Sequence, residues 1–478
     1  PPHGAGCACG APGADEEHRV LVLGAGVAGA TVARSLAAAG VGDVLVLEAA
    51  AVVGGRLRQA PLGDIKVEVG ANWVQGYTAE NSMSDFINST GLLGVPTDWD
   101  SLALVRPGGE VVPDEVADPL WEQFEEALAA TYRLAEELPT TQTVDVASAL
   151  LATGGWEALD PVAVAIERFY IDYEYAVPAA ELAVRGLAAM YRPDAAETVD
   201  YFVTDPRGFA HVVRRLLADA GIPNTASPPP NRLRLNTTVT DVAYGETGVC
   251  VTTADGRRFG ADYAVSTFSV GVLQAALMTG AARPAGAITL TPPVPAAKRL
   301  AISSMKLADY VKVFARWDEP IFSETDPLFL LPTSCEDDRW IDVHNLNHAG
   351  NMLPGGANVL LLTATASYGR ALTCQAANVT AAAIASIVSS IAGRPVPPPT
   401  HVTLGQWYAD PLFRGAYSAT PPGFGADDWA ELNRPLGRLH FAGEAHALNG
   451  TNGFVQGSWE SGIVTAAAVV AAIKAETA

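Results

Sequence analysis

The chain has 478 residues, of which 49% are hydrophobic and 17% charged, and it carries a formal net charge of -22 at pH 7. This length exceeds what one hydrophobic core usually serves, so we expect two large domains. The strong acidity argues against nucleic acid and anionic membranes as partners and favours the approach of a polycation. Five cysteines are too few for a disulfide scaffold, and their spacing predicts no metal site.

The N-terminal residues predict a mobile tail and a secretory origin. Residues 1–17 are rich in proline, glycine and alanine and begin without methionine, as they would after removal of a signal peptide. Four N-x-S/T sequons agree with this, and they begin at Asn88, Asn236, Asn378 and Asn449. We therefore expect a glycoprotein that is secreted or held in another secretory compartment. The longest late apolar stretch, residues 462–473, is too short to span a bilayer.

Residues 20–47 contain a pattern typical of a dinucleotide site. The apolar runs 20–23 and 44–47 predict two buried parallel strands, and residues 30–39 predict a helix between them. Three glycines in G-x-G-x-x-G spacing join the first strand to the helix, namely Gly24, Gly26 and Gly29. The first permits a tight turn, the second lets the backbone approach a pyrophosphate, and the third lets the helix pack closely on the strand. Free N–H groups at the start of the helix suit the phosphates.

The residues that follow favour FAD over NAD. Glu48 ends the second strand, where its carboxylate can accept hydrogen bonds from an adenosine ribose. Gly54 and Gly55 then form a second glycine turn, and Arg56 can place its guanidinium against a phosphate. A nicotinamide enzyme has no evident need of this second turn.

The remaining chain predicts a helical layer followed by short strands. Helical patterns occupy residues 121–138 and 161–170, and a third helix is expected at 208–218. Strands are expected at 233–235, 239–243, 249–253, 263–266, 311–316 and 359–366, with a hairpin turn at 255–256. Near the C-terminus we expect a strand over 439–444, a glycine-rich turn over 449–453 and a helix over 454–468.

Together these segments resemble the FAD-dependent amine oxidase family, and its plant-type polyamine oxidases most closely. The resemblance covers about residues 18–475. Besides the first glycine pattern, Glu48 and the strand that begins at Val239, its markers are GGR at 54–56, VEVGANWVQG at 67–76, DYEYAVP at 172–178, DPRGF at 205–209, SVGVLQ at 269–274, YVKVF at 310–314, QWYADPLFRGAYS at 406–418 and HFAGEAH at 440–446.

The resemblance implies an α/β fold with two discontinuous domains. A Rossmann-like FAD-binding domain would comprise residues 18–96, 206–298 and 400–478. A substrate-binding domain with a mixed sheet and helices would comprise residues 97–205 and 299–399.

The implied activity is oxidation of a polyamine, such as spermine, spermidine or an acetylated form, by hydride transfer to FAD. Oxygen would be reduced to H2O2, and the imine would be hydrolysed to an aminoaldehyde and an amine. Residues 445–457 contain no cysteine, so we expect non-covalent FAD. The expected partners are the small-molecule polyamine and O2, and the expected state is a monomer or weak homodimer.

Residue roles are carried over from the family position by position. Catalytic roles fall on Lys312, Trp407 and Tyr417, the first near flavin N5 and the other two as walls of an aromatic cage. A lysine buried beside a flavin can have a depressed pKa and relay protons. Strand alternation puts Lys312 on one face with Tyr310 and Phe314. The alternatives are an outward lysine on an edge strand and a core aromatic pair.

Two further sets of residues complete the expected site. Substrate-binding roles fall on Gln75, Glu174, Tyr175, Tyr310 and Phe454. Cofactor-binding roles fall on Gly24, Gly26, Gly29, Glu48, Gly55, Arg56, Ala71, Asn72, Trp73, Val239, Gly443, Glu444, Gly453, Phe454 and Val455.

Two positions depart from the plant relatives. Gln75 stands where those relatives carry glutamate, so an amide replaces a charge and the register in which a polyamine binds stays open. Phe454 stands where they often carry tyrosine. Other interpretations also stay open: an oxidase of another amine or of an L-amino acid, and a non-catalytic escort protein of the same fold. Intact Glu48, Arg56 and Glu444 argue against the escort protein.

Overall fold

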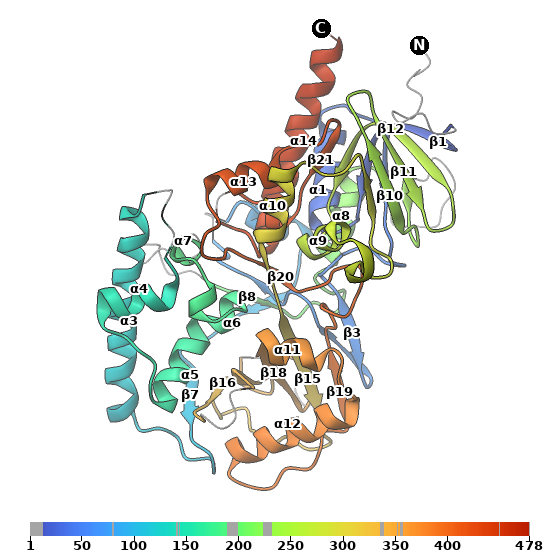
Figure 1. Ribbon diagram of the computed structural model, residues 1–478. Coiled ribbons are helices and arrows are strands. Elements are labelled where there is room, and N and C mark those ends of the chain that lie inside the picture. The colour runs from blue at the N-terminus through green and yellow to red at the C-terminus, as the bar shows by residue number, and fades with distance from the viewer. Residues whose placement is uncertain are drawn as a thin grey trace.

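Two β-sheets, each packed between layers of helices, organise the chain in the computed structural model (Figure 1). The structure describes residues 13–78, 81–139, 142, 144–188, 199–222, 232–334, 339–350, 352–353, 357–448 and 450–477. Three of the five cysteines and the sequon at Asn449 lie outside these ranges, and within them Cys250 and Cys374 are free thiols. Among the described helices, none combines the length and the apolar character that crossing a membrane requires.

The first sheet contains eight strands and includes both runs of the glycine pattern. Its order is β13-β10-β11-β12-β1-β2-β9, and β21 pairs with β12. The strands are β1 (Glu16–Leu23), β2 (Val44–Leu47), β9 (Leu233–Arg234), β10 (Val239–Tyr244), β11 (Val249–Thr253), β12 (Arg258–Ser266), β13 (Thr289–Thr291) and β21 (Leu439–Phe441). The parallel pairing of β1 with β2 and the hairpin between β11 and β12 are confirmed. The last strand stops at Phe441, short of the predicted Glu444, because residues 444–446 form a 3-10 turn.

Alternating side chains of this sheet enter two different cores. Val20 and Val22 pack with α1 (Val27–Ala38), α2 (Ser84–Thr90), α8 (His211–Asp219) and α14 (Val455–Thr477). Leu21 and Leu23 pack on the other face with α9 (Val270–Leu277), α10 (Ala296–Ser304) and α13 (Ala426–Asn433). A continuous apolar strand is what burial on both faces requires.

The second sheet has six strands and lies in the lower half of Figure 1. Its order is β19 (His401–Leu404), β15 (Tyr310–Arg316), β18 (Val359–Thr365), β17 (Asp342–Asn345), β16 (Phe329–Pro332) and β7 (Leu102–Val105). One face packs against α3 (Asp114–Glu137), α4 (Val146–Gly154), α5 (Pro161–Tyr170), α6 (Asp172–Tyr175) and α7 (Val184–Ala188), and the other against α11 (Ala366–Leu372) and α12 (Ala377–Ala392). The predicted alternation on β15 is confirmed, since Tyr310 and Phe314 join the first core and Val311 and Val313 the second.

Three small sheets connect the two large ones. They are β3 (Gln59–Leu62) with β4 (Ile65–Glu68), β5 (Trp73–Val74) with β8 (Tyr201–Val203) and β6 (Gly94–Pro96), and β14 (Lys306–Ala308) with β20 (Tyr417–Ala419). The short 3-10 helices are η1 (Ala179–Glu181), η2 (Gly280–Ala282) and η3 (Glu444–His446).

Two strands pair across the boundaries of the predicted domain division, which itself stays a prediction. β19 pairs with β15 in the second sheet, although residues 400–478 are predicted to join the first domain. β8 pairs with β5 and β6, although residues 97–205 are predicted to belong to the second. A strand joins the sheet whose edge its backbone can reach. Proline clusters, which suggested the domain boundaries, do not show which edge that is.

Candidate functional site

A cavity of about 2110 Å³, a volume that includes space open to solvent, is lined by residues from both sheets and from the small sheets between them. All predicted site residues line it except Gly29. The structure therefore brings together, in one cavity, Lys312, Trp407, Tyr417, Gln75, Glu174, Tyr175, Tyr310, Phe454, Gly24, Gly26, Glu48, Gly55, Arg56, Ala71, Asn72, Trp73, Val239, Gly443, Glu444, Gly453 and Val455.

Gly29 serves packing instead. A Cβ at this position would lie 2.0 Å from the carbonyl oxygen of Gly24, so a larger residue would push α1 away from β1. This is the close helix–strand approach expected of the third glycine.

One end of the cavity is shaped for a dinucleotide. The helix α1 begins after Gly26 without a side-chain cap, and the next residues, Val27 and Ala28, line the cavity, so their N–H groups can meet an anion. Glu48 is buried at the end of β2, where its carboxylate accepts hydrogen bonds from the backbone N–H groups of Ala25, at 2.7 Å, and Ala50, at 2.8 Å. Burial raises its pKa, and those backbone bonds oppose the rise. A carboxylate has further acceptor sites, so these residues fit an adenosine ribose and a pyrophosphate.

Arg56 and Glu444 join three segments of the wall. Nη1 of Arg56 donates to Oε1 of Glu444, at 2.9 Å, and to the carbonyl oxygen of Ala416, at 2.7 Å. The other carboxylate oxygen of Glu444 accepts from the backbone N–H groups of Ser418, at 3.2 Å, and Gly453, at 2.9 Å. One nitrogen of Arg56 is thus bound to protein. That its guanidinium meets a phosphate stays a prediction.

Lys312 is buried and held by the segment that follows β4. Its Nζ donates to the carbonyl oxygen of Gly70, at 2.8 Å, and to Oδ1 of Asn72, and it lies 4.8 Å from the ring centroid of Trp73. Burial lowers the pKa of Lys312 to about 7, against the opposing pull of the carboxyls of Glu68 and Glu174. A lysine in this state can hold or release a proton at neutral pH.

Glu68 is a buried neighbour that the sequence did not single out, although it lies in the marker VEVGANWVQG. Oε1 accepts a hydrogen bond of 2.8 Å from the backbone N–H of Phe209. Burial raises the pKa of Glu68 to about 7, and the Phe209 bond and the charge of Lys312 oppose the rise. Glu68 and Lys312, two groups of opposite charge that interact with each other, thus both have a pKa near neutral pH.

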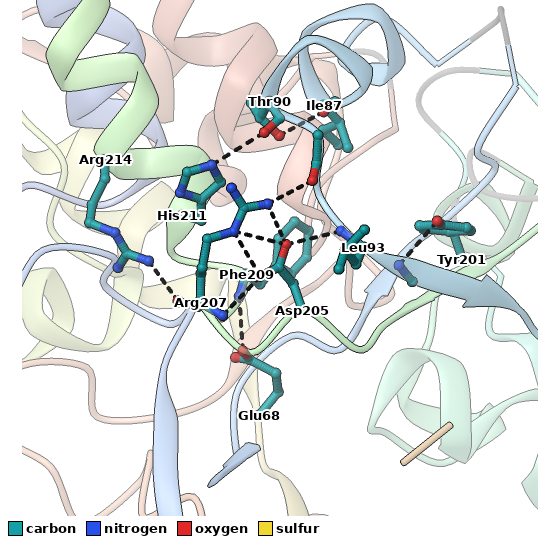
Figure 2. Close-up of polar contacts among 12 residues, drawn as sticks. Glu68, Ile87, Thr90, Leu93, Tyr201, Asp205, Arg207, Phe209, His211 and Arg214 are labelled. Atoms are coloured by element: carbon teal, nitrogen blue, oxygen red, sulfur yellow. Dashed lines mark hydrogen bonds and ion pairs between the residues drawn. The ribbon is translucent and has the colours of Figure 1, made fainter. Parts of the chain in front are cut away.

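Figure 2 shows how the DPRGF segment delivers Phe209 to Glu68. Arg207 forms a fork on Asp205, with Nε 2.9 Å from Oδ1 and Nη2 2.6 Å from Oδ2. Although burial alone would raise it, the bonds from Arg207 and Leu93 lower the pKa of Asp205 to about 2. The fork fixes the turn that precedes α8. The DPRGF segment therefore holds the backbone N–H that binds Glu68, the carboxyl that interacts with Lys312.

Aromatic rings line the part of the cavity next to Lys312. Nε1 of Trp407 donates to the carbonyl oxygen of Val69, at 3.2 Å, which fixes the indole. The hydroxyl of Tyr417 donates to the backbone oxygen of Glu174, at 2.9 Å, and its ring centroid lies 5.7 Å from that of Tyr310. The hydroxyl of Tyr175 donates to the carbonyl oxygen of Leu187, at 3.1 Å, so Tyr175 presents mainly its ring.

Glu174 behaves differently from a free carboxylate at a tunnel mouth. Oε1 accepts a hydrogen bond of 2.9 Å from Nε2 of Gln75. Burial, followed by the negative charge of Asp200, raises the pKa of Glu174 to about 8, and Lys312 opposes the rise. Near neutral pH this carboxyl therefore holds its proton until a cation approaches it.

Sequence reasoning also passed over Tyr173, Asp342 and His344. Tyr173 lines the cavity and lies in the marker DYEYAVP, so that marker was the available signal. Asp342 and His344 lie on β17, whose sequence DVHN has no apolar run from which to predict a strand.

Comparisons with known proteins show which family the chain resembles. The family model of flavin containing amine oxidoreductases matches residues 27–470. The chain is 30% identical over 466 residues to polyamine oxidase 6 of Oryza sativa subsp. japonica, covering 94% of this chain and 90% of that protein. It is 29% identical over 469 residues to polyamine oxidase 1 of Zea mays, covering 94% and 89%. A structure titled as wild-type putrescine oxidase bound to putrescine matches the fold with a TM-score of 0.73 at 19% identity, covering 95% of this chain and 99% of that chain.

Proposed function

The chain belongs to the flavin-containing amine oxidoreductase family, and on this premise we propose that it oxidises a polyamine. Its cofactor is FAD. The residues around α1, Glu48 and Arg56 would hold this cofactor without a covalent bond. When bound, FAD accepts a hydride from the carbon next to an amine nitrogen and passes the electrons to O2, which leaves as H2O2.

The observation that carries the proposal is the buried Lys312 in a cavity that also contains aromatic rings and a proton-holding carboxyl. Amine oxidation requires a neutral nitrogen, whose lone pair assists as hydride leaves the adjacent carbon. A lysine with a pKa of about 7 can take up or return a proton at that pH through a water held next to it.

The substrate class follows from the other groups in the cavity. Rings of Trp407, Tyr417 and Tyr310 offer faces to a neutral or cationic amine chain. Glu174 provides one site where a distal ammonium can be neutralised, since its carboxyl ionises when a cation approaches. The net charge of -22 favours the approach of a polycation over that of an anionic substrate.

Peroxide release from purified holoprotein tests the substrate class. The panel would contain spermine, spermidine, their acetylated forms, monoamines and L-amino acids. We expect peroxide with at least one polyamine and much less with monoamines and amino acids. Peroxide formed only with an amino acid or a monoamine would refute a polyamine substrate.

We also propose that the protein is secreted and glycosylated. In support, the side chains of Asn88, Asn236 and Asn378 are exposed at their sequons. Endoglycosidase treatment of protein from its natural source should raise its mobility on a gel. Unchanged mobility would argue against glycosylation.

A further inference from the structure

Two uncharged oxygens hold the amine of Lys312 in the cavity wall. Nζ donates to the carbonyl oxygen of Gly70, at 2.8 Å, and to the side-chain oxygen Oδ1 of Asn72. Lys312 and Asn72 are both buried, and both line the cavity. Asn72 therefore contacts the predicted proton carrier directly, although the sequence predicts for it only a role in cofactor binding.

The segment that supplies these oxygens is fixed by its own contacts. A Cβ at Gly70 would lie 1.7 Å from the carbonyl oxygen of Arg56, so only glycine lets the two backbones approach this closely. The N–H of Ala71 donates to the same oxygen, at 3.3 Å. The carbonyl oxygen of Asn72 accepts from the N–H of Val203, at 2.8 Å. The positions of the two acceptors therefore do not depend on Lys312.

Both contacts can be kept in either protonation state of Lys312. The carbonyl oxygen of Gly70 and Oδ1 of Asn72 can only accept hydrogen bonds. An ammonium has three N–H donors and a neutral amine has two, so each state has enough donors for both acceptors. Loss of a proton changes only the remaining position on Nζ, from an N–H donor to a lone pair.

The contacts to Nζ involve no carboxylate within the described residues. Burial disfavours the charged amine, and the carboxyls of Glu68 and Glu174 oppose this effect without bonding to Nζ. Nζ also lies 4.8 Å from the ring centroid of Trp73 and 5.7 Å from that of Tyr310. A carboxylate bonded to a buried amine would favour the ammonium strongly, because opposite charges attract more in a low-dielectric site. The amide of Asn72 offers the same acceptor without that charge.

We propose that Asn72 is the positioning residue of Lys312. Its uncharged oxygen holds the amine at one point in both protonation states, so that Lys312 can release and regain a proton without moving. An aspartate of the same shape would keep the amine in its charged form, and a leucine would free it. The use of this proton in amine oxidation rests on the proposed function, whereas the contact and its effect on the Lys312 proton do not.

Titration of the lysine side chains by NMR tests the proposal without reference to activity. In full-length holoprotein labelled with 13C-lysine, the chemical shift of Cε reports whether an amine is charged, and Lys312→Met identifies the Lys312 signal by its loss. We expect the midpoint for Lys312 to rise by about 1–3 pH units in Asn72→Asp, the range for an opposite charge in contact. In Asn72→Leu it should fall by about one pH unit, because the buried ammonium loses one hydrogen bond.

The pH dependence of turnover separates positioning from a structural role. In Asn72→Asp, the change of kcat/KM with pH should move upward together with the NMR midpoint of Lys312. This movement should be absent when Lys312→Met is added, because the two changes act on the same proton. Gln123→Glu on the exposed face of α3, which also turns an amide into a carboxyl, is the control and should leave both titrations unchanged.

A Lys312 midpoint in Asn72→Asp equal to that of the unmodified protein would overturn the proposal. A loss of kcat/KM of the same size at every pH would show a merely structural role and overturn it as well. Flavin absorbance checks that each variant contains FAD. If Asn72→Asp does not fold, the Asn72→Leu titration decides, since a fall supports the proposal and an unchanged midpoint overturns it. Absence of polyamine oxidation in the unmodified protein would refute the proposed function instead, and the NMR titration would still decide the role of Asn72.

Discussion

The side-chain amide of Gln75 donates a 2.9 Å hydrogen bond to the carboxyl of Glu174 in the wall of the cavity. This contact places the residue that departs from the plant relatives directly on the acid expected to attract amino groups. An amide adds no charge, so the site has one carboxyl where a glutamate at residue 75 would create a pair. The proton on Glu174 is then the only one that a distal ammonium must displace at this contact.

Gln75→Glu should therefore change substrate preference. Two carboxyls at this separation share a proton, because both cannot ionise together, and an ammonium would release that proton. We expect kcat/KM for spermine to rise about tenfold, within the range of hydrogen bonds to charged groups, with a smaller rise for N-acetylspermine. Gln123→Glu on the exposed face of α3 is the control.

Two other outcomes of the Gln75→Glu comparison are informative. Loss of N-acetylspermine activity with no gain on spermine would mean that Gln75 suits a neutral acetamide. An unchanged ratio of the two kcat/KM values would contradict any contact between residue 75 and the substrate.

Glu174→Gln should flatten the pH dependence of stability. Burial raises the pKa of Glu174 in the folded state to about 8 from its ordinary value of 4.5, so the native state binds the extra proton between these values. Its contribution to the free energy of unfolding is thus present below pH 4.5 and lost as pH rises to about 8, by at most about 5 kcal/mol. Deprotonation of Lys312 changes the free energy of unfolding in the opposite direction above pH 7. The quantity to measure is therefore the difference in free energy of unfolding between the unmodified protein and Glu174→Gln.

Chemical denaturation at pH 5 and pH 8 provides that difference, with Glu125→Gln on α3 as the control. If the unmodified protein and Glu174→Gln lose the same free energy of unfolding between these pH values, Glu174 does not hold a proton in the native state.

Glu48→Ala should weaken FAD binding. The change removes an acceptor for the ribose and also frees the N–H groups of Ala25 and Ala50, which shape the turn before α1. We expect an increase of at least about tenfold in the Kd for FAD, measured by flavin fluorescence. Glu125→Ala should bind FAD normally, and a Glu48→Ala protein with full occupancy and unchanged Kd would remove Glu48 from the cofactor site.

Lys312→Met should leave FAD bound but slow flavin reduction or reoxidation by at least about tenfold, the low side of general acid–base effects. Lys312 loses its proton as pH rises through about 7. The change of the flavin reduction or reoxidation rate with pH near that value should therefore disappear in the variant. Stopped-flow absorbance across pH 6–9 follows both half-reactions, and Lys306→Met at the surface is the control. Traces that match the unmodified protein at every pH would exclude Lys312 from the mechanism.

The sequence predicted the parts of the molecule where local pattern and chemistry coincide. The glycine spacing determined the turn before α1, and the alternation around Lys312 determined which face of β15 meets the cavity. The pairing of β19 with β15 and the position of β17 depend on contacts between distant segments, which no local pattern encodes.

The same limit explains the missed site residues. Glu68 matters because Phe209, far along the chain, donates to it beside the strand of Lys312. His344 contacts the cavity wall only because α6 brings Tyr173 to it. In both cases the residue type alone suggested an ordinary polar strand residue, and only the tertiary structure gives it a partner.

Anaerobic mixing of the holoprotein with spermine, followed by flavin absorbance, tests the central claim most directly. If a polyamine is the substrate, the oxidised flavin bands should bleach in a single turnover with spermine or N-acetylspermine and return with H2O2 when oxygen is admitted. A holoprotein with full FAD occupancy whose flavin stays oxidised with every polyamine, yet bleaches with a monoamine or an L-amino acid, would contradict a polyamine substrate.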